Sequence, residues 1–261
     1  MKPTRRTLVL LWMAVMLLSA SPVRSDMAAP LMRPDPPTIA IIIDDLGYRR
    51  LEGQRVLALP WAVTLSILPH TPFGREFAEG GHAKGMEIML HLPLQPEDSS
   101  VDLGPGGIWL ESGSRDVSGL LSESLASVPH AVGVNNHMGS MLTRHPGHMT
   151  WLMEELDRRK LFFVDSFTTP FSVALQMAHE TGVPAVRRHV FLDANPDEDA
   201  VAAEFDRLLE LAREQGYAVA IGHPYPGTIN VLEQRLPELE RNGFRLVPAS
   251  QLIKQVNRTG R

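Results

Sequence analysis

Short apolar runs alternate with amphipathic segments along the chain from Thr38 onward. The first run, Ile-Ala-Ile-Ile-Ile over 39–43, is rich in β-branched residues and is typical of a buried strand. The pattern predicts strands over 39–45, 62–68, 87–92, 132–136, 162–165, 186–192, 217–221 and 244–247. It predicts helices over 49–59, 73–84, 116–128, 148–160, 172–181, 197–215 and 229–242.

Strict alternation of strands and helices favours parallel strands joined by helical crossovers. Seven or eight such units predict a distorted (β/α) barrel of about seven parallel strands, in the α/β class, over residues 38–253. An open doubly wound sheet is the alternative. Residues 254–261 are assigned to a C-terminal tail, and the proline-rich residues 26–37 to a linker.

The first 25 residues have the layout of an export signal. Basic Lys2, Arg5 and Arg6 precede an apolar stretch over 8–18, and small residues at 23 and 25 suit a cleavage site before Asp26. This stretch is shorter than the roughly 20 residues that cross a bilayer. We therefore expect a signal peptide over 1–25 and a periplasmic or secreted protein. The alternative is that this segment stays uncleaved and is then the protein's only contact with the membrane.

Composition narrows the chemistry. The chain has no cysteine, which excludes disulfides, a cysteine nucleophile and a thiolate zinc site. Its net charge of −5 gives no reason to expect nucleic-acid binding.

Polar residues gather where the predicted strands end. Asp44 and Asp45 close the first strand, and burying carboxylates is costly unless they are paired or bound to a metal. An N-cap pair for the next helix is the alternative. Because neighbouring residues on a strand point to opposite faces, we expect these two acids to point apart and to play different roles. Other predicted strands end at His91, at Asn135, Asn136 and His137, at Asp165 and Ser166, near Asp193, and at His223.

In a parallel barrel these strand ends meet on one face. Two or three imidazoles with a carboxylate favour a divalent metal, either zinc or cobalt, nickel or manganese. His91 could instead cap a strand, and Asp193 fits a turn or cap in LDANPD. Trp109 suits either a sugar-stacking platform or a satellite-core residue. The seven other histidines are interpreted as ordinary: His70, His82, His130, His145, His148, His179 and His189.

These motifs resemble the divergent polysaccharide deacetylase family, a distant branch of the carbohydrate esterases that remove N-acetyl groups from chitin and peptidoglycan. The resemblance covers Thr38 to about Ile253 and rests on IAIIIDDLGY, EIMLHLPL, GVNNHMGS, FFVDS, FLD and AIGHPYPGT. It implies a distorted barrel of about seven strands. It also implies a metal, expected to be zinc, and a polysaccharide or peptidoglycan-type glycan as substrate.

The resemblance implies roles for single residues. Asp44 matches the general base, Asp45 and His91 match metal ligands, His223 matches the general acid, and Asp165 matches the supporting aspartate.

Two departures from the mainstream deacetylases stand out. Gln95 occupies the place of the second histidine of the His-x-x-x-His pair, and NNHMGS replaces the Arg/Pro/Tyr motif. We infer that His137 supplies the missing imidazole, giving a ligand set of Asp45, His91 and His137. Asn135, Asn136 and Trp109 are assigned to substrate binding.

Three functions remain open from the sequence. The first is a metal-dependent deacetylase of an N-acetylated glycan. The second is a non-catalytic glycan-binding or regulatory protein that keeps the barrel. The third is a phosphatase or glycosidase with paired carboxylates, a role for which two acids that point apart are poorly suited.

Overall fold

The computed structural model describes residues 35–60 and 62–259, so the predicted signal peptide and most of the predicted linker lie outside the described residues. Within these residues the strands are β1 (Thr38–Leu46), β2 (Thr64–Ile67), β3 (Ile88–Leu94), β4 (Ala131–Met138), β5 (Phe162–Asp165), β6 (Ala185–Arg187), β7 (Val190–Phe191), β8 (Tyr217–Gly222) and β9 (Arg245–Leu246). The helices are α1 (Arg50–Val56), α2 (Gly74–Ala83), α3 (Ser114–Ser127), α4 (Pro146–Arg159), α5 (Ala174–Thr181), α6 (Glu198–Gln215), α7 (Pro226–Arg235) and α8 (Ala249–Thr259). None of these helices is long and apolar enough to cross a membrane.

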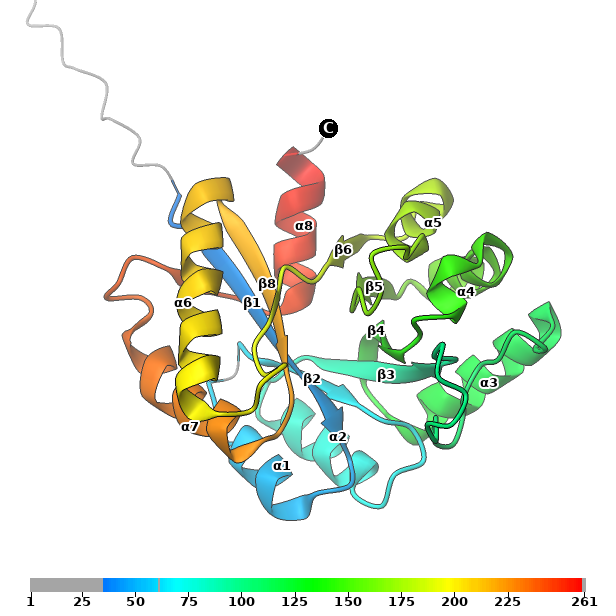
Figure 1. Ribbon diagram of the computed structural model, residues 1–261, viewed down its shortest axis with the longest axis horizontal. Helices are drawn as coiled ribbons and strands as arrows, with labels where there is room; N and C mark the ends of the chain where they lie inside the picture. Colours follow the sequence, from blue (N-terminus) through cyan, green and yellow to red (C-terminus); the bar gives the residue numbers. More distant parts are fainter. Residues whose placement is uncertain (1–34, 61, 260–261) are drawn as a thin grey trace, which may run out of the picture. The chain divides into compact units, whose positions relative to one another are not determined.

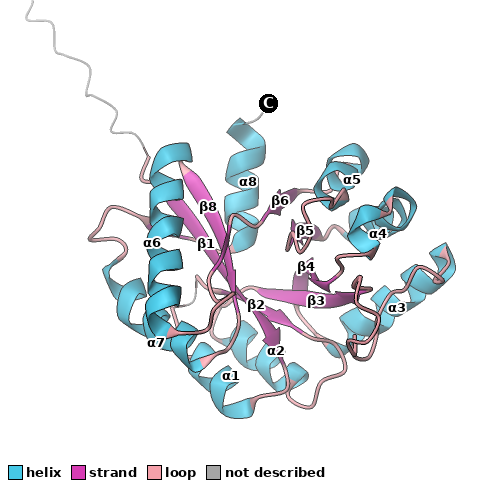
Figure 2. Cartoon of the chain, viewed as in Figure 1, coloured by secondary structure: helices cyan, strands magenta, loops and turns pink. Residues whose placement is uncertain are grey.

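The strands form one parallel sheet in the order β6-β5-β4-β3-β2-β1-β8-β7, with β9 beside β1. The sheet curls into a half-barrel, and helices α1 to α7 alternate with the strands around its outside (Figures 1 and 2). The predicted distorted (β/α) barrel is therefore confirmed. Since every strand pair is parallel, the carboxyl ends of the strands open on the same side.

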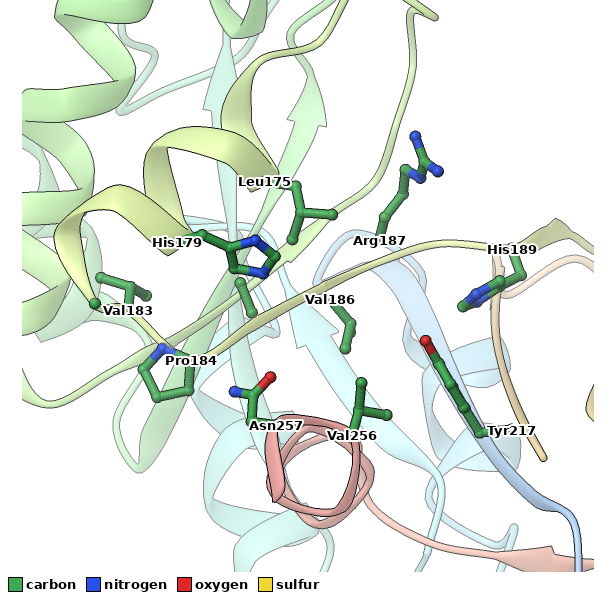
Figure 3. Close-up of a pocket in the computed structure, with 12 residues that line it drawn as sticks. Leu175, His179, Val183, Pro184, Val186, Arg187, His189, Tyr217, Val256 and Asn257 are labelled. Atoms are coloured by element: carbon green, nitrogen blue, oxygen red, sulfur yellow. The ribbon is translucent and has the colours of Figure 1, made fainter. Parts of the chain in front are cut away.

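The single strand predicted over 186–192 is wrong, because the chain changes sheet edge within it. Strand β6 pairs with β5, whereas β7 pairs with β8. The backbone N–H of Arg188 donates to Asp165 on one edge, and that of His189 donates to Val219 on the other. A cavity of about 700 Å³ lies beside β6, where the chain changes sheet edge. It is lined by residues of α5, β6 and α8 and by Tyr217 (Figure 3).

Strand β1 is buried on both faces, as its continuous apolar run predicts. Ile41 and Ile43 pack in the larger core cluster, whereas Ile42 lies in a second cluster with Leu252 and Ile253 of α8. Helix α8 continues to Thr259, so most of the segment assigned to a tail is helical. Its buried residues Ala249, Leu252 and Ile253 anchor the helix against the sheet, and Val256, in the segment assigned to a tail, packs partly buried against the same cluster.

The fold predicts a stability effect at Gly133 in β4. A Cβ at this position would lie 2.3 Å from the Phe162 ring, so Gly133→Ala forces buried groups apart. We expect a loss of about 1–3 kcal/mol in unfolding free energy, with a Tm lower by roughly 2–4 °C for each kcal/mol. Gly119→Ala, at an exposed position of α3, is the matched control, since nothing lies within 4 Å of its added Cβ. Chemical denaturation measures the unfolding free energy of both variants and of the unmodified protein. If Gly133→Ala were as stable as the unmodified protein, the tight packing around Gly133 would be refuted.

Candidate metal centre

The two acids near the end of β1 both face His91, which corrects the expectation that they point apart. Asp45 has a φ of 55°, in the left-handed region, and the register between β1 and β2 shifts between Ile43 and Leu46. This irregular backbone breaks the alternation of a regular strand. Asp44 Oδ2 lies 3.6 Å from His91 Nε2, and Asp45 Oδ1 lies 3.2 Å from the same nitrogen.

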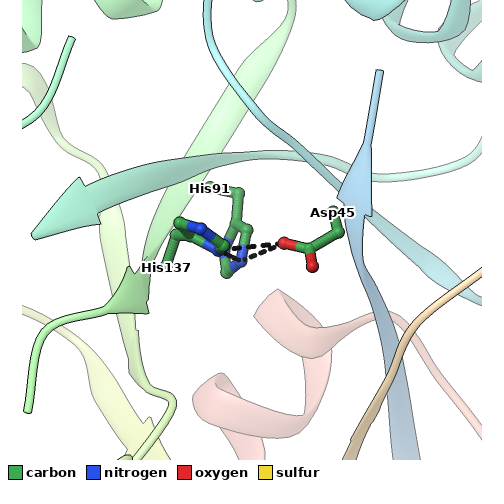
Figure 4. Close-up of side chains that lie close together, drawn as sticks. All are labelled: Asp45, His91 and His137. Carbon is green, nitrogen blue, oxygen red and sulfur yellow. Dashed lines mark hydrogen bonds and ion pairs between the residues drawn. The ribbon is translucent and has the colours of Figure 1, made fainter. Parts of the chain in front are cut away.

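The structure brings the three predicted ligands, Asp45, His91 and His137, together from β1, β3 and β4 (Figure 4). Asp45 Oδ1 lies 3.2 Å from His91 Nε2 and 2.9 Å from His137 Nδ1. The two imidazole nitrogens are 3.2 Å apart. The three donor atoms therefore form a nearly equilateral triangle at the carboxyl edge of the sheet.

This triangle fits a divalent cation with oxygen and nitrogen ligands. Ligand atoms bound tetrahedrally at about 2.0–2.1 Å are roughly 3.3 Å from one another, close to the three observed separations. Asp45 Oδ1 is buried, and it accepts no well-formed hydrogen bond within the described part of the chain. Burial alone would raise the pKa of Asp45, but His137 and His91 outweigh it and lower that pKa. The carboxylate is thus ionised and directed at its neighbours.

Asn135 holds His91 in the tautomer that a metal ligand needs. Asn135 Oδ1 accepts from Ser66 Oγ at 2.7 Å and lies 2.8 Å from His91 Nδ1, while its Nδ2 donates to Asp44 Oδ1 at 2.8 Å. An amide oxygen can only accept, so His91 Nδ1 carries the proton and Nε2 presents its lone pair to the triangle. Burial lowers the pKa of His91, but Asp44 and Asp45 outweigh it and raise that pKa. A cation would therefore compete with a proton at Nε2.

His223 stands beside the triangle and is fixed by Asp193. Its Nε2 lies 3.8 Å from Asp45 Oδ2, and its Nδ1 lies 2.8 Å from Asp193 Oδ1. Asp193 Oδ2 also accepts from the His223 backbone at 2.6 Å and from Thr228 Oγ1 at 2.6 Å. Burial lowers the pKa of His223, but the hydrogen bond and charge of Asp193 outweigh it and raise the pKa to about 9. The imidazole is therefore protonated at neutral pH.

Asp193 is a site residue that the sequence interpretation missed. It lies in a turn, as LDANPD indicates, but it is also buried and serves His223. The available signal was its place at the end of a predicted strand.

Asp165 orders the loop after β5. Its Oδ1 accepts from the Phe167 backbone and its Oδ2 accepts from Ser172 Oγ. Burial raises the pKa of Asp165. The half-buried guanidinium of Arg188 lies within electrostatic reach of both Asp165 and Asp44, while its own burial lowers its pKa. Arg188 places a cation near the acids without the Arg/Pro/Tyr motif, and the sequence analysis did not single it out.

The residues assigned to substrate binding have other contacts. Both ends of the Asn136 amide are engaged, since Nδ2 donates to Met138 O and Oδ1 accepts from Ser166 N. Asn135 is similarly engaged within the site. Trp109 is half-buried in the loop after β3, where its backbone N–H donates to Ser112 Oγ. Substrate contact by these three residues stays a prediction, whereas positioning by the two amides is visible in the contacts.

Gln95 has a structural contact in place of the absent histidine. Its Oε1 accepts from the Leu110 backbone at 2.7 Å, and its carbonyl accepts from Met141 and Leu142. The side chain therefore ties the long loop after β3 to the strand end. His137 lies at the third corner of the triangle, and its replacement of the missing imidazole stays a prediction.

Replacing Asn135 with leucine tests the positioning of His91. The change keeps side-chain size but removes the acceptor that fixes the tautomer, so we expect zinc affinity to fall about 10- to 100-fold. Asn136→Leu is the matched control, because it removes a neighbouring amide whose partners are loop backbone. Competition with a chromogenic chelator measures both affinities. If both variants lose affinity equally, the effect is general loosening of the strand end and the assignment of Asn135 fails.

The parallel half-barrel thus carries an acid and two imidazoles together at its strand ends, the arrangement that the sequence resemblance implies. The divergent polysaccharide deacetylase family model matches residues 41–253, and this chain belongs to that family. It is 39% identical over 217 residues to the uncharacterized protein YibQ of Escherichia coli K12, covering 83% of this chain and 67% of YibQ.

Two solved structures share the fold. An uncharacterized protein from Agrobacterium tumefaciens C58 superposes with a TM-score of 0.81 at 23% identity, over 84% of this chain and 89% of that one. The catalytic domain of a peptidoglycan N-acetylglucosamine deacetylase from Eubacterium rectale superposes with a TM-score of 0.52 at 16% identity, over 85% and 92% of the two chains. At these identities the likeness shows the fold.

Proposed function

We propose that this protein is a metal-dependent deacetylase that removes acetyl groups from an N-acetylated glycan. The observation that carries the proposal is the triangle of Asp45, His91 and His137, flanked by Asp44 and by His223. Family membership supports a polysaccharide as the substrate class. A peptidoglycan-type glycan is the specific substrate that we propose.

Asp45, His91 and His137 would hold the cation, and zinc suits two imidazole nitrogens with one carboxylate. When bound, the cation would polarise the acetamide carbonyl as a Lewis acid and lower the pKa of water. Cobalt, nickel and manganese accept the same donors.

Asp44 and His223 divide the proton transfers. Asp44 is buried and oriented by Asn135 Nδ2, so its second oxygen is directed toward the triangle to accept a proton from the attacking water. His223 is kept protonated by Asp193 and would donate from Nε2 to the leaving amine. Water adds to the carbonyl carbon, the C–N bond breaks, and acetate and a free amine leave.

We further propose that the protein acts outside the cytoplasm. The support is the basic, apolar and small-residue order of residues 1–25, which suits export to the periplasm or beyond. A glycan of the cell envelope would be accessible there.

A non-catalytic glycan-binding role is the second candidate, and Gln95 is the observation that favours it. This residue ties down a loop where the mainstream deacetylases place a ligand, so the site has departed from that pattern. A barrel that retained its fold while losing turnover would bind glycan without releasing acetate.

One experiment separates the two candidates. The purified, zinc-loaded protein is incubated with N-acetylglucosamine oligomers and with peptidoglycan fragments, and free acetate and glycan binding are both measured. The deacetylase proposal expects acetate at a rate that rises with zinc occupancy. Binding without acetate, across these substrates, would favour the non-catalytic candidate and contradict the proposal.

A further inference from the structure

A small pocket adjoins the triangle on the side of His137. It has a volume of about 330 Å³, at the small end of the range for ligand sites, and therefore suits one monosaccharide ring better than a longer segment. It lies between the loop after β1 and the long loop after β3. Its lining includes Tyr48, Asp102, Leu103, Gly104 and His137.

Tyr48 forms an exposed aromatic wall of this pocket. Its side chain is 52% exposed, three residues beyond the proposed ligand Asp45. Gly47 before it has a φ of 136°, and a Cβ there would lie 2.0 Å from Thr71 Oγ1, so the backbone course that presents Tyr48 requires glycine. The backbone thus places Tyr48 next to the site, and aromatic rings pack well against the C–H face of a sugar.

The opposite wall is an ordered turn. Leu103 is buried and anchors it, while Asp102 Oδ1 accepts from the Gly104 backbone at 3.0 Å. A Cβ on Gly104 would come 4.0 Å from the Tyr48 hydroxyl, so the two walls face each other closely. Among the described residues no hydrogen bond to Asp102 Oδ2 is present, which leaves this oxygen for a hydroxyl or an amine.

We propose that this pocket binds a pyranose ring without an acidic substituent, either uncharged or amine-bearing, next to the ring that loses its acetyl group. The inference rests on the proposed function for the place of the reacting ring. Tyr48 packs against the sugar face, and Asp102 accepts from its hydroxyls or amine. The carboxylate of Asp102 repels a uronic acid in the same position, so the pocket selects against acidic glycans.

The test measures binding by the full zinc-loaded chain carrying Asp44→Asn, so that probes are not consumed. Three probes are titrated by calorimetry: tetra-N-acetylchitotetraose, its fully deacetylated tetramer and tetragalacturonate. Tyr48→Ala should weaken binding of both amino-sugar tetramers about tenfold, and Tyr48→Phe should retain most of the affinity. Leu51→Ala is the matched control, since Leu51 is 75% exposed on α1 outside the pocket, and it should change nothing.

Asp102 gives the second readout. Asp102→Asn should weaken binding of the deacetylated tetramer more than binding of the acetylated one. It should strengthen binding of tetragalacturonate. Unchanged affinities in Tyr48→Ala, or tightest binding of tetragalacturonate by the protein with Asp102 intact, would overturn the inference. Failure of every probe to bind would overturn it as well.

The proposed function fails by a different observation. If the chain with Asp44 intact releases no acetate while binding still depends on Tyr48, the deacetylase proposal falls and the sugar pocket stands. If the chain releases acetate but its glycan affinity is the same with Tyr48→Ala, the deacetylase proposal stands and the sugar pocket falls.

Discussion

Replacing His137 with alanine is expected to leave a folded protein that neither retains a divalent cation nor releases acetate. His137 Nδ1 is one of the three donor atoms, 2.9 Å from Asp45 Oδ1 and 3.2 Å from His91 Nε2. Two remaining ligands hold zinc weakly, and the carbonyl is no longer polarised. We expect bound zinc to fall from about one per chain to near zero after dialysis. Elemental analysis and acetate assays measure the two effects.

His82→Ala is the matched control for this change. His82 is an exposed histidine of α2 whose ring stacks on His130, away from the three donor residues. Its removal should leave zinc content and acetate release unaltered. Zinc retained by His137→Ala at the level of the control would show that His137 is no ligand. The inference that His137 supplies the imidazole missing at position 95 would then be wrong.

The second large effect is expected from Asp44→Asn, which removes the proposed base while keeping its shape. Asp44 accepts from Asn135 and is not one of the three donor residues, so zinc content should be unchanged. The amide cannot take a proton from water, and acetate release should fall about 10²- to 10⁴-fold. Parallel zinc and acetate measurements separate this outcome from simple loss of the cation.

Asp157→Asn controls for the change of charge alone, because Asp157 is a surface residue paired with Lys160. It should retain full activity. Turnover by Asp44→Asn within a few-fold of this control would rule out Asp44 as the base.

The fold was predictable because its signals are local. The apolar run of β1, the alternation of strands with amphipathic helices and the polar residues at strand ends each act over a few residues. Parallel pairing then places the strand ends on one side, so the meeting of Asp45, His91 and His137 followed from topology.

The features that the sequence did not reveal depend on contacts distant in sequence or on backbone conformation. The left-handed φ of Asp45 turns its carboxylate beside that of Asp44, and no residue pattern encodes that. Asp193 appears as a turn residue until His223, 30 positions later, is placed against it. The split between β6 and β7 arises because successive residues donate to opposite edges of the sheet: Arg188 N–H to Asp165, and His189 N–H to Val219.

The location of the cation in zinc-soaked crystals is the most direct test of the account. Anomalous scattering above the zinc edge should give one strong peak bounded by His91 Nε2, His137 Nδ1 and the Asp45 carboxylate, and the peak should vanish in His137→Ala. A principal peak elsewhere, for example at the stacked pair of His82 and His130, or no peak at the strand ends, would contradict the metal centre on which the proposed chemistry depends.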